Sequence, residues 1–226
     1  MKKYVIIAAG GSGNRMHSAT PKQFLLLADK PILMHAINAF HQCDAAIKVI
    51  VVLPENHISE WEKLCEKYKF TINHAIAEGG ETRFHSVKNG LALITADYAY
   101  DERGLIAIHD GVRPLVSTQL INKVFETAER SGSAIPAIPV DESIRNVKDD
   151  QNKAVDRKDY RIIQTPQCFS AGIIKKAYEQ AYNDTFTDEA SVVEAAGEKI
   201  HLVEGEIKNM KITTPQDLLI AEMLIK

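Results

Sequence analysis

Two basic residues close to a glycine-rich segment are the first residues of this chain that could do chemistry. The segment AAGGSGNRM spans residues 8–16, and its first two residues are the end of the apolar stretch Tyr4–Ala9. Small residues let backbone N–H groups approach an anionic ligand closely and point at its oxygens. Arg15 and Lys22 flank Pro21, which favours an extended conformation in the residue before it, so the two cations can converge. The pattern predicts a nucleotide phosphate site, although a tight turn with two solvated charges also fits it.

The segment lacks the marks of two common nucleotide-binding loops. A Walker A loop needs a Gly-Lys-Ser/Thr sequence, which does not follow here. Met16 stands where the dinucleotide fingerprint has its third glycine. The fingerprint also needs an acid at the end of the second strand, where this chain has Leu53-Pro54 before Glu55. A nicotinamide-dependent oxidoreductase is therefore disfavoured.

A second polar cluster lies at the start of an expected helix, Glu81–Ile94. Gly79 and Gly80 precede this helix, and Arg83 and Ser86 are three residues apart and share one face of it. A helix N-terminus with paired glycines, an arginine and a hydroxyl can hold a phosphate or the polar edge of a base. Ordinary helix capping is the alternative explanation.

An acid and an arginine follow the expected strand Leu105–Ile108. The sequence HDGVRP at residues 109–114 puts Asp110 and Arg113 at the carboxyl end of the strand, where open α/β sheets bind ligands. Asp110 is a candidate ligand for a divalent cation. An Asp-Gly turn or a simple salt bridge between Asp110 and Arg113 is the alternative. His109 is expected to be a satisfied core or supporting histidine rather than a metal ligand.

These residues need a scaffold of strands and helices. Continuous apolar runs predict buried strands, and apolar residues at helical spacing predict helices. In chain order, we expect strand Tyr4–Ala9, helix Ile32–Cys43, strand Val49–Leu53, helix Ile58–Lys69, strand His74–Ala77, helix Glu81–Ile94, strand Leu105–Ile108 and helix Asn122–Arg130. The alternation predicts a Rossmann-like α/β fold, a mostly parallel twisted sheet flanked by helices, in a single domain over residues 1–226.

The alternation changes after the expected strand Ala134–Val140, whose two prolines predict an edge strand or an exit from the sheet. Residues 141–165 are polar, with β-like stretches Ser143–Val147 and Tyr160–Gln164 around turn-rich residues 149–152, which predicts a projecting β-hairpin arm. Beyond the arm we expect helices Gly172–Tyr182 and Glu189–Ala196, strands Ile200–Val203 and Met210–Ile212, and a helix from Pro215 to the end with Thr214 as its N-cap.

Composition narrows the class of protein. The 226 residues are 45% hydrophobic and 25% charged, which is ordinary for a globular protein, and a net charge of -3 does not favour nucleic-acid binding. The first apolar run is too short for a signal peptide or a membrane span, so we expect a cytoplasmic protein without membrane association. Cys43, Cys65 and Cys168 are widely spaced and odd in number, which predicts reduced thiols.

Eight short motifs occur in one order along nearly the whole chain. They are AAGGSGNRM, PKQF, GGETRFHSV, HDGVRP, VDR, TPQ, TDEAS and NMKITTPQDL. Singly, the later motifs are weak, since Thr187 could be a helix N-cap and Lys211 a surface lysine. Together, the set resembles the methylerythritol-phosphate cytidylyltransferase family of the non-mevalonate isoprenoid pathway. The related ribitol-phosphate cytidylyltransferases share the glycine loop, PKQ and the strand-end Asp and Arg, so ribitol phosphate is the alternative acceptor.

The resemblance implies transfer of CMP from CTP to 2-C-methyl-D-erythritol 4-phosphate, with release of pyrophosphate. The catalytic cations would be Arg15, Lys22 and Lys211. The nucleotide would contact Ala8, Ala9, Gly10, Gly11, Ser12, Gly13, Gly80, Arg83 and Ser86. The acceptor would contact Asp110, Arg113, Ser143, Arg157, Thr187 and Lys211. A Mg²⁺ ion would assist, with Asp110 as its candidate protein ligand.

The resemblance also implies a homodimer. In the family the arm reaches across to the partner subunit, so Arg157 would complete the partner's acceptor site, with Ser143 at the position of an arm threonine. No general base is expected, because a phosphate acceptor is largely ionised near neutral pH, its second pKa being about 6. A nucleotide sensor, which would bind CTP without turnover, is the alternative outside the enzymes.

Overall fold

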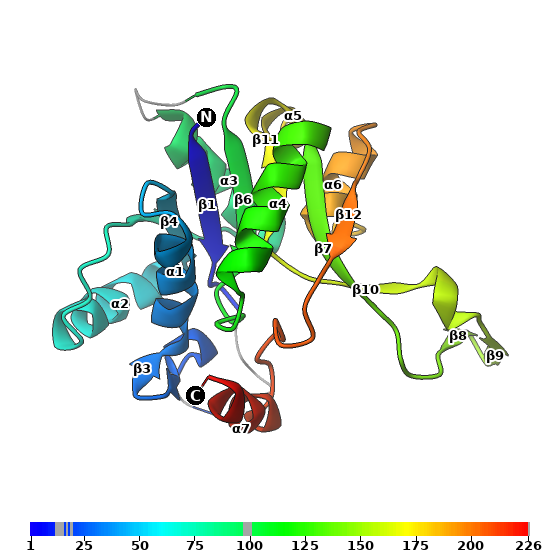
Figure 1. The fold of residues 1–226 in the computed structure, drawn as a ribbon, viewed down its shortest axis with the longest axis horizontal. Helices are drawn as coiled ribbons and strands as arrows, with labels where there is room; N and C mark the ends of the chain where they lie inside the picture. The colour runs from blue at the N-terminus through cyan, green and yellow to red at the C-terminus, as the bar shows by residue number, and fades with distance from the viewer. Residues whose placement is uncertain (12–15, 17, 19, 97–100, 226) are drawn as a thin grey trace.

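A mixed sheet runs through the centre of the chain (Figure 1). The computed structural model describes residues 1–11, 16, 18, 20–96 and 101–225. Within that part the sheet has eight strands in the order β10-β7-β11-β6-β1-β4-β5, with β12 beside β7. At its centre β1 (Lys3–Ala8) pairs in parallel with β4 (Lys48–Leu53) and β6 (Leu105–Asp110). The predicted Rossmann-like, mostly parallel sheet is confirmed.

The central strands separate two helical layers. Val5 of β1 packs in the core on the side of α1 (Ile32–Cys43) and α4 (Thr118–Ser131), whereas Ile6 packs on the side of α3 (Arg83–Ala96). Successive side chains of a strand point to opposite faces of the sheet, which is why neighbours enter different cores. Because both faces are covered, β1 is apolar throughout its buried part, as the continuous apolar run predicted.

The other elements are short or lie toward the edges of the sheet. The strand β5 (Ala75–Glu78) pairs with β4 and ends one side of the sheet, and α2 (Glu55–Lys67) follows β4. Short elements of this kind include the 3-10 helix η2 (Lys22–Phe24), β2 (Leu26–Leu27), β3 (Lys30–Pro31), α5 (Ala171–Ala177) and β12 (Leu202–Glu204). No helix in the described ranges is long and apolar enough to cross a membrane.

The start of the last helix agrees with the sequence prediction, whereas the bounds of two other helices differ from it. The last helix, α7 (Pro215–Leu224), begins at Pro215 with Thr214 as its N-cap, as predicted. The helix α4 begins four residues before the expected Asn122, because Ser117 caps it by accepting a hydrogen bond from the amide of Leu120. The helix expected to reach Tyr182 is α5, which ends at Ala177.

The N-cap of α6 (Glu189–Ala195) differs from the expectation. It is Asp188 rather than Thr187. The carboxylate of Asp188 accepts from the amide of Ser191 at 2.9 Å, and the hydroxyl of Ser191 accepts from the amide of Asp188 at 3.3 Å. This reciprocal pair satisfies two amides at once, which a cap at Thr187 would not do.

A small hairpin projects from the body of the molecule (Figure 1). It is formed by β8 (Arg145–Lys148) and β9 (Gln151–Ala154), which pair antiparallel through a turn at Asp149, whose φ is 53°. The expectation that Tyr160–Gln164 would be the second strand of this hairpin was wrong. A 3-10 turn, η3 (Arg157–Asp159), brings the chain back toward the sheet instead.

The strand that returns from the arm joins the main sheet. β10 (Arg161–Ile163) pairs antiparallel with β7 (Ser133–Pro139), and β12 pairs with β7 on the other side. β7 is therefore not an edge strand, although the chain does leave the sheet at Pro139. Pro136 is tolerated because it lies between the segments of β7 that pair with β11 and β10, and its carbonyl accepts from the amide of Gln164.

Two further differences concern short segments. β11 (Gln167–Ser170) inserts antiparallel between β6 and β7 and was not expected, because four residues are too few to show a pattern. The strand expected at Met210–Ile212 is absent, because these described residues form no regular secondary structure and lie outside the sheet. The Ile212 amide donates to the carbonyl of Val112, which ties this segment to the loop after β6.

Candidate active site

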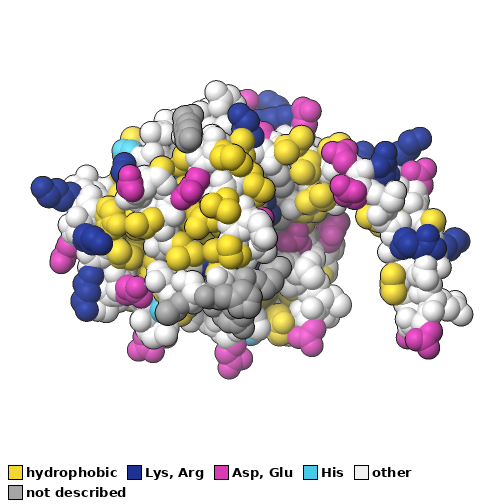
Figure 2. Space-filling view, turned by 90° about the horizontal axis from the view of Figure 1, so that it is seen from below, with side chains coloured by type: hydrophobic (Ala, Val, Ile, Leu, Met, Phe, Trp, Pro, Cys, Tyr) yellow, Lys and Arg dark blue, Asp and Glu magenta, His cyan; other side chains and the backbone are white. Residues whose placement is uncertain are grey.

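A cavity of about 230 Å³ lies at the carboxyl ends of β1 and β6. Figure 2 views the molecule from this end, with the arm standing apart from the body. The wall of the cavity includes predicted residues from the glycine loop, the PKQF motif, the GGETRFHSV cluster, and the motifs HDGVRP and NMKITTPQDL. They are Ala8, Ala9, Gly10, Gly11, Lys22, Gly80, Arg83, Ser86, Asp110 and Lys211. Segments far apart in the sequence thus meet where parallel strands end, as is usual for ligand sites of α/β sheets.

The start of the glycine loop is fixed by the sheet. The amide of Ala9 donates to the carbonyl of Val52 at 3.0 Å, and the carbonyl of Ala8 accepts from Gly111 at 2.9 Å. A Cβ atom at Gly11 would lie 2.9 Å from both Cε and Nζ of Lys22. Glycine at this position therefore gives the end of the Lys22 side chain room beside the loop. Ser12, Gly13 and Arg15 lie outside the described residues.

The turn before α3 is closed by a side chain from the helix. The amide of Gly80 donates to Oγ of Ser86 at 3.0 Å. A Cβ atom at Gly80 would lie 2.4 Å from Cβ of His85, so only glycine fits there. Gly80 and Ser86 thus form one structural unit in the cavity wall.

Asp110 is surrounded by cations. Its Oδ1 accepts from Nη1 of Arg83 at 2.8 Å, and its Oδ2 accepts from Nε of Arg113 at 3.0 Å and lies 3.2 Å from Nζ of Lys211. The side chain of Asp110 is 6% exposed. Burial alone would raise the pKa of the carboxyl, but Arg83, Lys211 and Arg113 outweigh it and hold this pKa well below its usual range. Asp110 is therefore a permanent anion.

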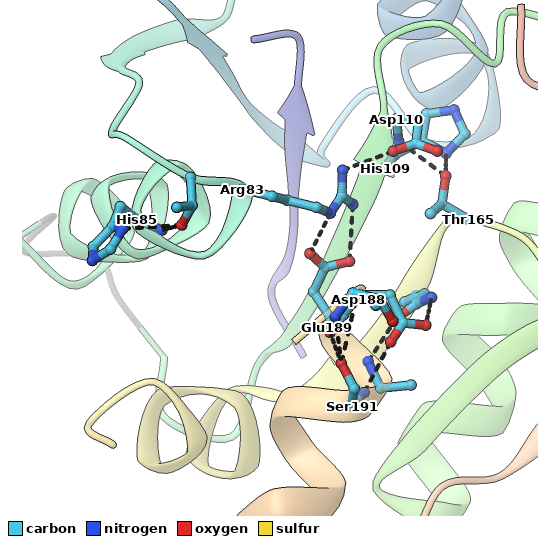
Figure 3. A network of polar contacts seen from close by, with 12 residues as sticks. Arg83, His85, His109, Asp110, Thr165, Asp188, Glu189 and Ser191 are labelled. Atoms are coloured by element: carbon cyan, nitrogen blue, oxygen red, sulfur yellow. Dashed lines mark hydrogen bonds and ion pairs between the residues drawn. The ribbon is translucent and has the colours of Figure 1, made fainter. Parts of the chain in front are cut away.

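Arg83 binds a second carboxylate, which the sequence analysis did not single out. Its Nε and Nη2 donate to the two carboxylate oxygens of Glu189 at 2.9 and 3.0 Å (Figure 3). Glu189 is 1% exposed. Three of the five N–H groups of Arg83 therefore donate to carboxylates, which leaves two for the nucleotide contact predicted from the sequence. Glu189 is in the TDEAS motif, but nothing in the sequence marks its partner.

His109 and Thr165 support Asp110 from behind (Figure 3). Oγ1 of Thr165 accepts from the amide of Asp110 at 2.9 Å and lies 3.1 Å from Nδ1 of His109. Nε2 of His109 lies 3.1 Å from the carbonyl of Arg113, which can only accept, so Nε2 carries the proton and Nδ1 accepts from Thr165. Burial lowers the pKa of His109 to about 4, and the ring is neutral. The expected supporting role of His109 agrees with this geometry.

A second cavity of about 290 Å³ adjoins the first. Its wall includes Arg113 and Thr187, and it shares Arg83, Asp110 and Lys211 with the first cavity. The three shared side chains form the boundary between the two spaces, which we call the shared wall. Two ligands, one in each cavity, would approach each other at this wall.

A match over nearly the whole chain identifies its family. A family profile described as "IspD: 2-C-methyl-D-erythritol 4-phosphate cytidylyltransferase" matches residues 3–226. This chain belongs to the IspD family. The resemblance carried by the eight motifs is thereby confirmed.

Relatives of the IspD family match the chain end to end. A 2-C-methyl-D-erythritol 4-phosphate cytidylyltransferase of Bacteroides thetaiotaomicron is 48% identical over 225 residues, which cover 100% of each chain. The crystal structure of the enzyme of the same name from Thermus thermophilus is 31% identical, covers 99% of this chain and 98% of that one, and has a TM-score of 0.77. The corresponding structure from Francisella tularensis is 30% identical over 99% of both chains, with a TM-score of 0.78.

The remaining site residues expected for an IspD family member lie on the arm. Ser143 and Arg157 are exposed, and neither lines the two cavities of its own chain. Arg157 donates through Nη1 to the carbonyl of Asp141 at the base of the arm. Their predicted contact with the acceptor stays a prediction. Cys43, Cys65 and Cys168 are free thiols, as expected.

Proposed function

We propose that this chain transfers the cytidylyl group of CTP to 2-C-methyl-D-erythritol 4-phosphate and releases pyrophosphate. The observation that carries the proposal is the shared wall, where Arg83, Asp110 and Lys211 face both cavities. CTP in the first cavity and the phosphorylated acceptor in the second would bring their reacting phosphates to this wall. Membership of the IspD family, matched over residues 3–226, supports these two substrates.

The reaction needs positive charge rather than a base. An oxygen of the acceptor phosphate attacks the α-phosphorus of CTP, the bond from that phosphorus to the α,β-bridging oxygen breaks, and pyrophosphate leaves with the electron pair. Lys22 and Lys211 on the cavity walls, together with Arg15, would stabilise the charge that develops. Removing one such contact typically costs about 10²-fold in rate. The acceptor phosphate needs no deprotonation near neutral pH.

Binding of the two substrates divides between the two cavities. The glycine loop, Gly80 and Ser86 would hold the nucleotide, with backbone groups near Ala8 and Ala9 selecting cytosine over purines. Arg113, Thr187 and Lys211 would hold the acceptor phosphate in the second cavity.

The arm is the reason to propose a homodimer. It projects from the body (Figure 2), so Ser143 and Arg157 would complete the acceptor site of a partner subunit and not that of their own chain.

The substrates are charged small molecules, which do not cross membranes unaided. We therefore propose that the enzyme works in the cytoplasm, where CTP is present.

A Mg²⁺ ion fits the site with one protein ligand. In the described ranges no three His, Cys, Asp or Glu side chains are grouped to hold a metal. Mg²⁺ commonly takes one or two carboxylates and completes its shell with water and phosphate oxygens. Oδ1 of Asp110 accepts from Arg83 and retains a second acceptor direction for such an ion. When bound, the ion would neutralise charge on the triphosphate.

The proposal is tested by pyrophosphate release. The purified chain is incubated with CTP, Mg²⁺ and either 2-C-methyl-D-erythritol 4-phosphate or ribitol 5-phosphate, beside a Lys22→Ala variant. Release with the methylerythritol acceptor alone, slowed by about 10²-fold in the variant, is the expected result. Release with ribitol 5-phosphate alone would reassign the acceptor, and silence with both would contradict a transferase.

A further inference from the structure

Glu189 is a buried carboxylate that the proposed chemistry does not yet use. The residue is 1% exposed and lines neither of the two cavities. Burying a carboxylate removes its hydration, and this is tolerated only when a partner with good geometry compensates for the loss. Arg83 is that partner, and Glu189 in turn helps to keep the pKa of Arg83 raised against the lowering effect of its own burial.

The contact between Glu189 and Arg83 fixes the direction of the guanidinium. Two parallel hydrogen bonds, from Nε at 2.9 Å and Nη2 at 3.0 Å, hold the planar group at one edge. The opposite corner, Nη1, is thereby directed at Oδ1 of Asp110 at 2.8 Å (Figure 3). A bidentate fork leaves little freedom of rotation, so the position of Nη1 follows from that of Glu189.

Glu189 itself is held on a rigid support. The side chain of Gln167 on β11 contacts the residues on either side of it: Nε2 donates to Asp188 at 2.9 Å, and Oε1 accepts from the amide of Ala190 at 2.9 Å. Gln167 is 1% exposed. The first turn of α6 is therefore fastened to the central sheet beside the strand that carries Asp110.

We propose that Glu189 is a positioning residue for cytidylyl transfer: it holds Arg83 so that Arg83 fixes the Asp110 carboxylate against Lys211 and Arg113. The inference rests on the proposed function. The chain of contacts runs from Glu189 through Arg83 to Oδ1 of Asp110, and from Oδ2 of the same carboxylate to Nζ of Lys211 at 3.2 Å. Two carboxylates share Arg83, which leaves Lys211 on the exposed side of the shared wall, where the reacting phosphates would meet.

Loss of the Glu189 charge should act on the chemical step. Arg83 would then be free to turn an edge with two N–H groups toward Asp110 and compete with Lys211 for that carboxylate. Lys211 would be displaced from the shared wall, and misplacement of a charged group by about 1 Å can cost about 10²-fold in rate. Binding of CTP should change less, because the glycine loop, Gly80 and Ser86, which would hold the nucleotide in the first cavity, are unaltered.

The test compares Glu189→Gln with Glu194→Gln, an exposed position on the same helix. With CTP and 2-C-methyl-D-erythritol 4-phosphate, we expect kcat of Glu189→Gln to fall between about 10- and 100-fold, with KM for CTP changed less than about 3-fold. Glu194→Gln should match the wild type. A folded Glu189→Gln protein with wild-type kcat would overturn the inference while leaving the proposed function intact, whereas a wild type without turnover would remove both.

A double-mutant cycle separates positioning from a purely structural role. If Glu189 acts through Asp110, adding Glu189→Gln to Asp110→Asn should lower kcat by less than about 3-fold further. Independent, multiplying losses would contradict the inference. Should Glu189→Gln fail to fold, Glu189→Asp serves in the cycle, since it keeps the charge but is too short to accept from both Nε and Nη2 of Arg83. The same coupling with Asp110→Asn is then expected, and its absence would be decisive against the proposal.

Discussion

Five charged side chains share the centre of the site, and three of them are cations. Arg83, Arg113 and Lys211 contact Asp110, and Glu189 takes the other edge of Arg83. The excess of positive charge suits two phosphorylated substrates. The two carboxylates hold the cations in place before the substrates bind, so substrate binding does not have to order these side chains. Lys211, with 41% of its side chain exposed, is the cation of this group best placed to contact a substrate phosphate.

Replacement of Lys211 tests the role of this charge. Lys211→Met should lower kcat/KM for transfer by about 10²-fold, since one stabilising contact to the developing charge is lost. The fold should persist, because Asp110 keeps Arg83 and Arg113 as partners. Steady-state kinetics and thermal unfolding measure the two effects. Lys208→Met, an exposed neighbour, is the control and should stay within about 2-fold of the wild type. Equal kinetics for both variants would contradict the assignment of Lys211.

Protonation of His109 should make the free energy of unfolding depend on pH. Burial lowers the pKa of His109 from 6.5 to about 4. Between these values the unfolded chain binds a proton that the native chain does not, so stability falls as pH drops through this window, by up to about 3 kcal/mol. Asp110 contributes little to this difference, because the stability that comes from its lowered pKa is lost only as pH falls through and below the unfolded-chain value of 3.8.

The measurement is urea unfolding at about pH 7 and about pH 4.5, compared between the wild type and His109→Gln. The variant should lose stability at both pH values, because it disturbs a buried network, but its difference between the two should be smaller. An unchanged difference would show that His109 titrates normally.

At the scale of the elements, the sequence predicts best what one segment decides alone. β1 and β4 are recognisable because a strand buried on both faces is apolar throughout, and α7 because Thr214 and Pro215 mark its start. β11 and the pairing of β10 with β7 depend on distant segments and have no local signal.

The same distinction applies to the site. The glycines, Lys22, Asp110 and Lys211 were predicted by motif and strand position, and the structure brings the described ones together in one cavity wall. The contact of Arg83 with Glu189 spans 106 positions in the sequence, so no spacing rule could reveal it. Thr165 was missed for the same reason, since it supports Asp110 from a distance of 55 positions.

The turn at Gly80 allows a prediction about an element. Gly80→Ala would place a methyl group 2.4 Å from Cβ of His85, which would force the turn before α3 to move. Such overpacking costs about 1 to 3 kcal/mol, and KM for CTP should rise by about 10-fold or more. Gly172→Ala is the matched control, because a Cβ there meets nothing within 4 Å. Steady-state kinetics with varied CTP would decide, and an unaltered KM in Gly80→Ala would speak against this turn as part of the nucleotide site.

At the scale of the whole molecule, the hairpin of the arm contributes no residue to the two cavities of its own chain. The hairpin β8–β9 stands clear of the body in Figures 1 and 2, and Arg157 at its base faces neither cavity. The arm is narrower than predicted, because β10 belongs to the main sheet. A homodimer in which arms are exchanged would give this segment a function.

Mixed dimers test that arrangement. A subunit with Lys22→Ala and a subunit with Arg157→Ala should each be nearly inactive alone. After dissociation and reassociation of an equal mixture, half of the dimers are mixed, and each contains one site with an intact Lys22 and an intact partner Arg157. Recovery of about a quarter of the wild-type activity is expected for such symmetric pairing. No recovery from a mixture shown to contain mixed dimers would place both residues in the same chain's site.

In the proposed reaction, the α-phosphate of CTP and the acceptor phosphate are joined at the shared wall. Phosphorus NMR of the protein with CTP, Mg²⁺ and 2-C-methyl-D-erythritol 4-phosphate tests it most directly. We expect two mutually coupled signals of a new diphosphate ester, which appear together with pyrophosphate and form about 10²-fold more slowly in Lys211→Met. Unchanged CTP and acceptor signals, or CMP and pyrophosphate without a coupled pair, would contradict it.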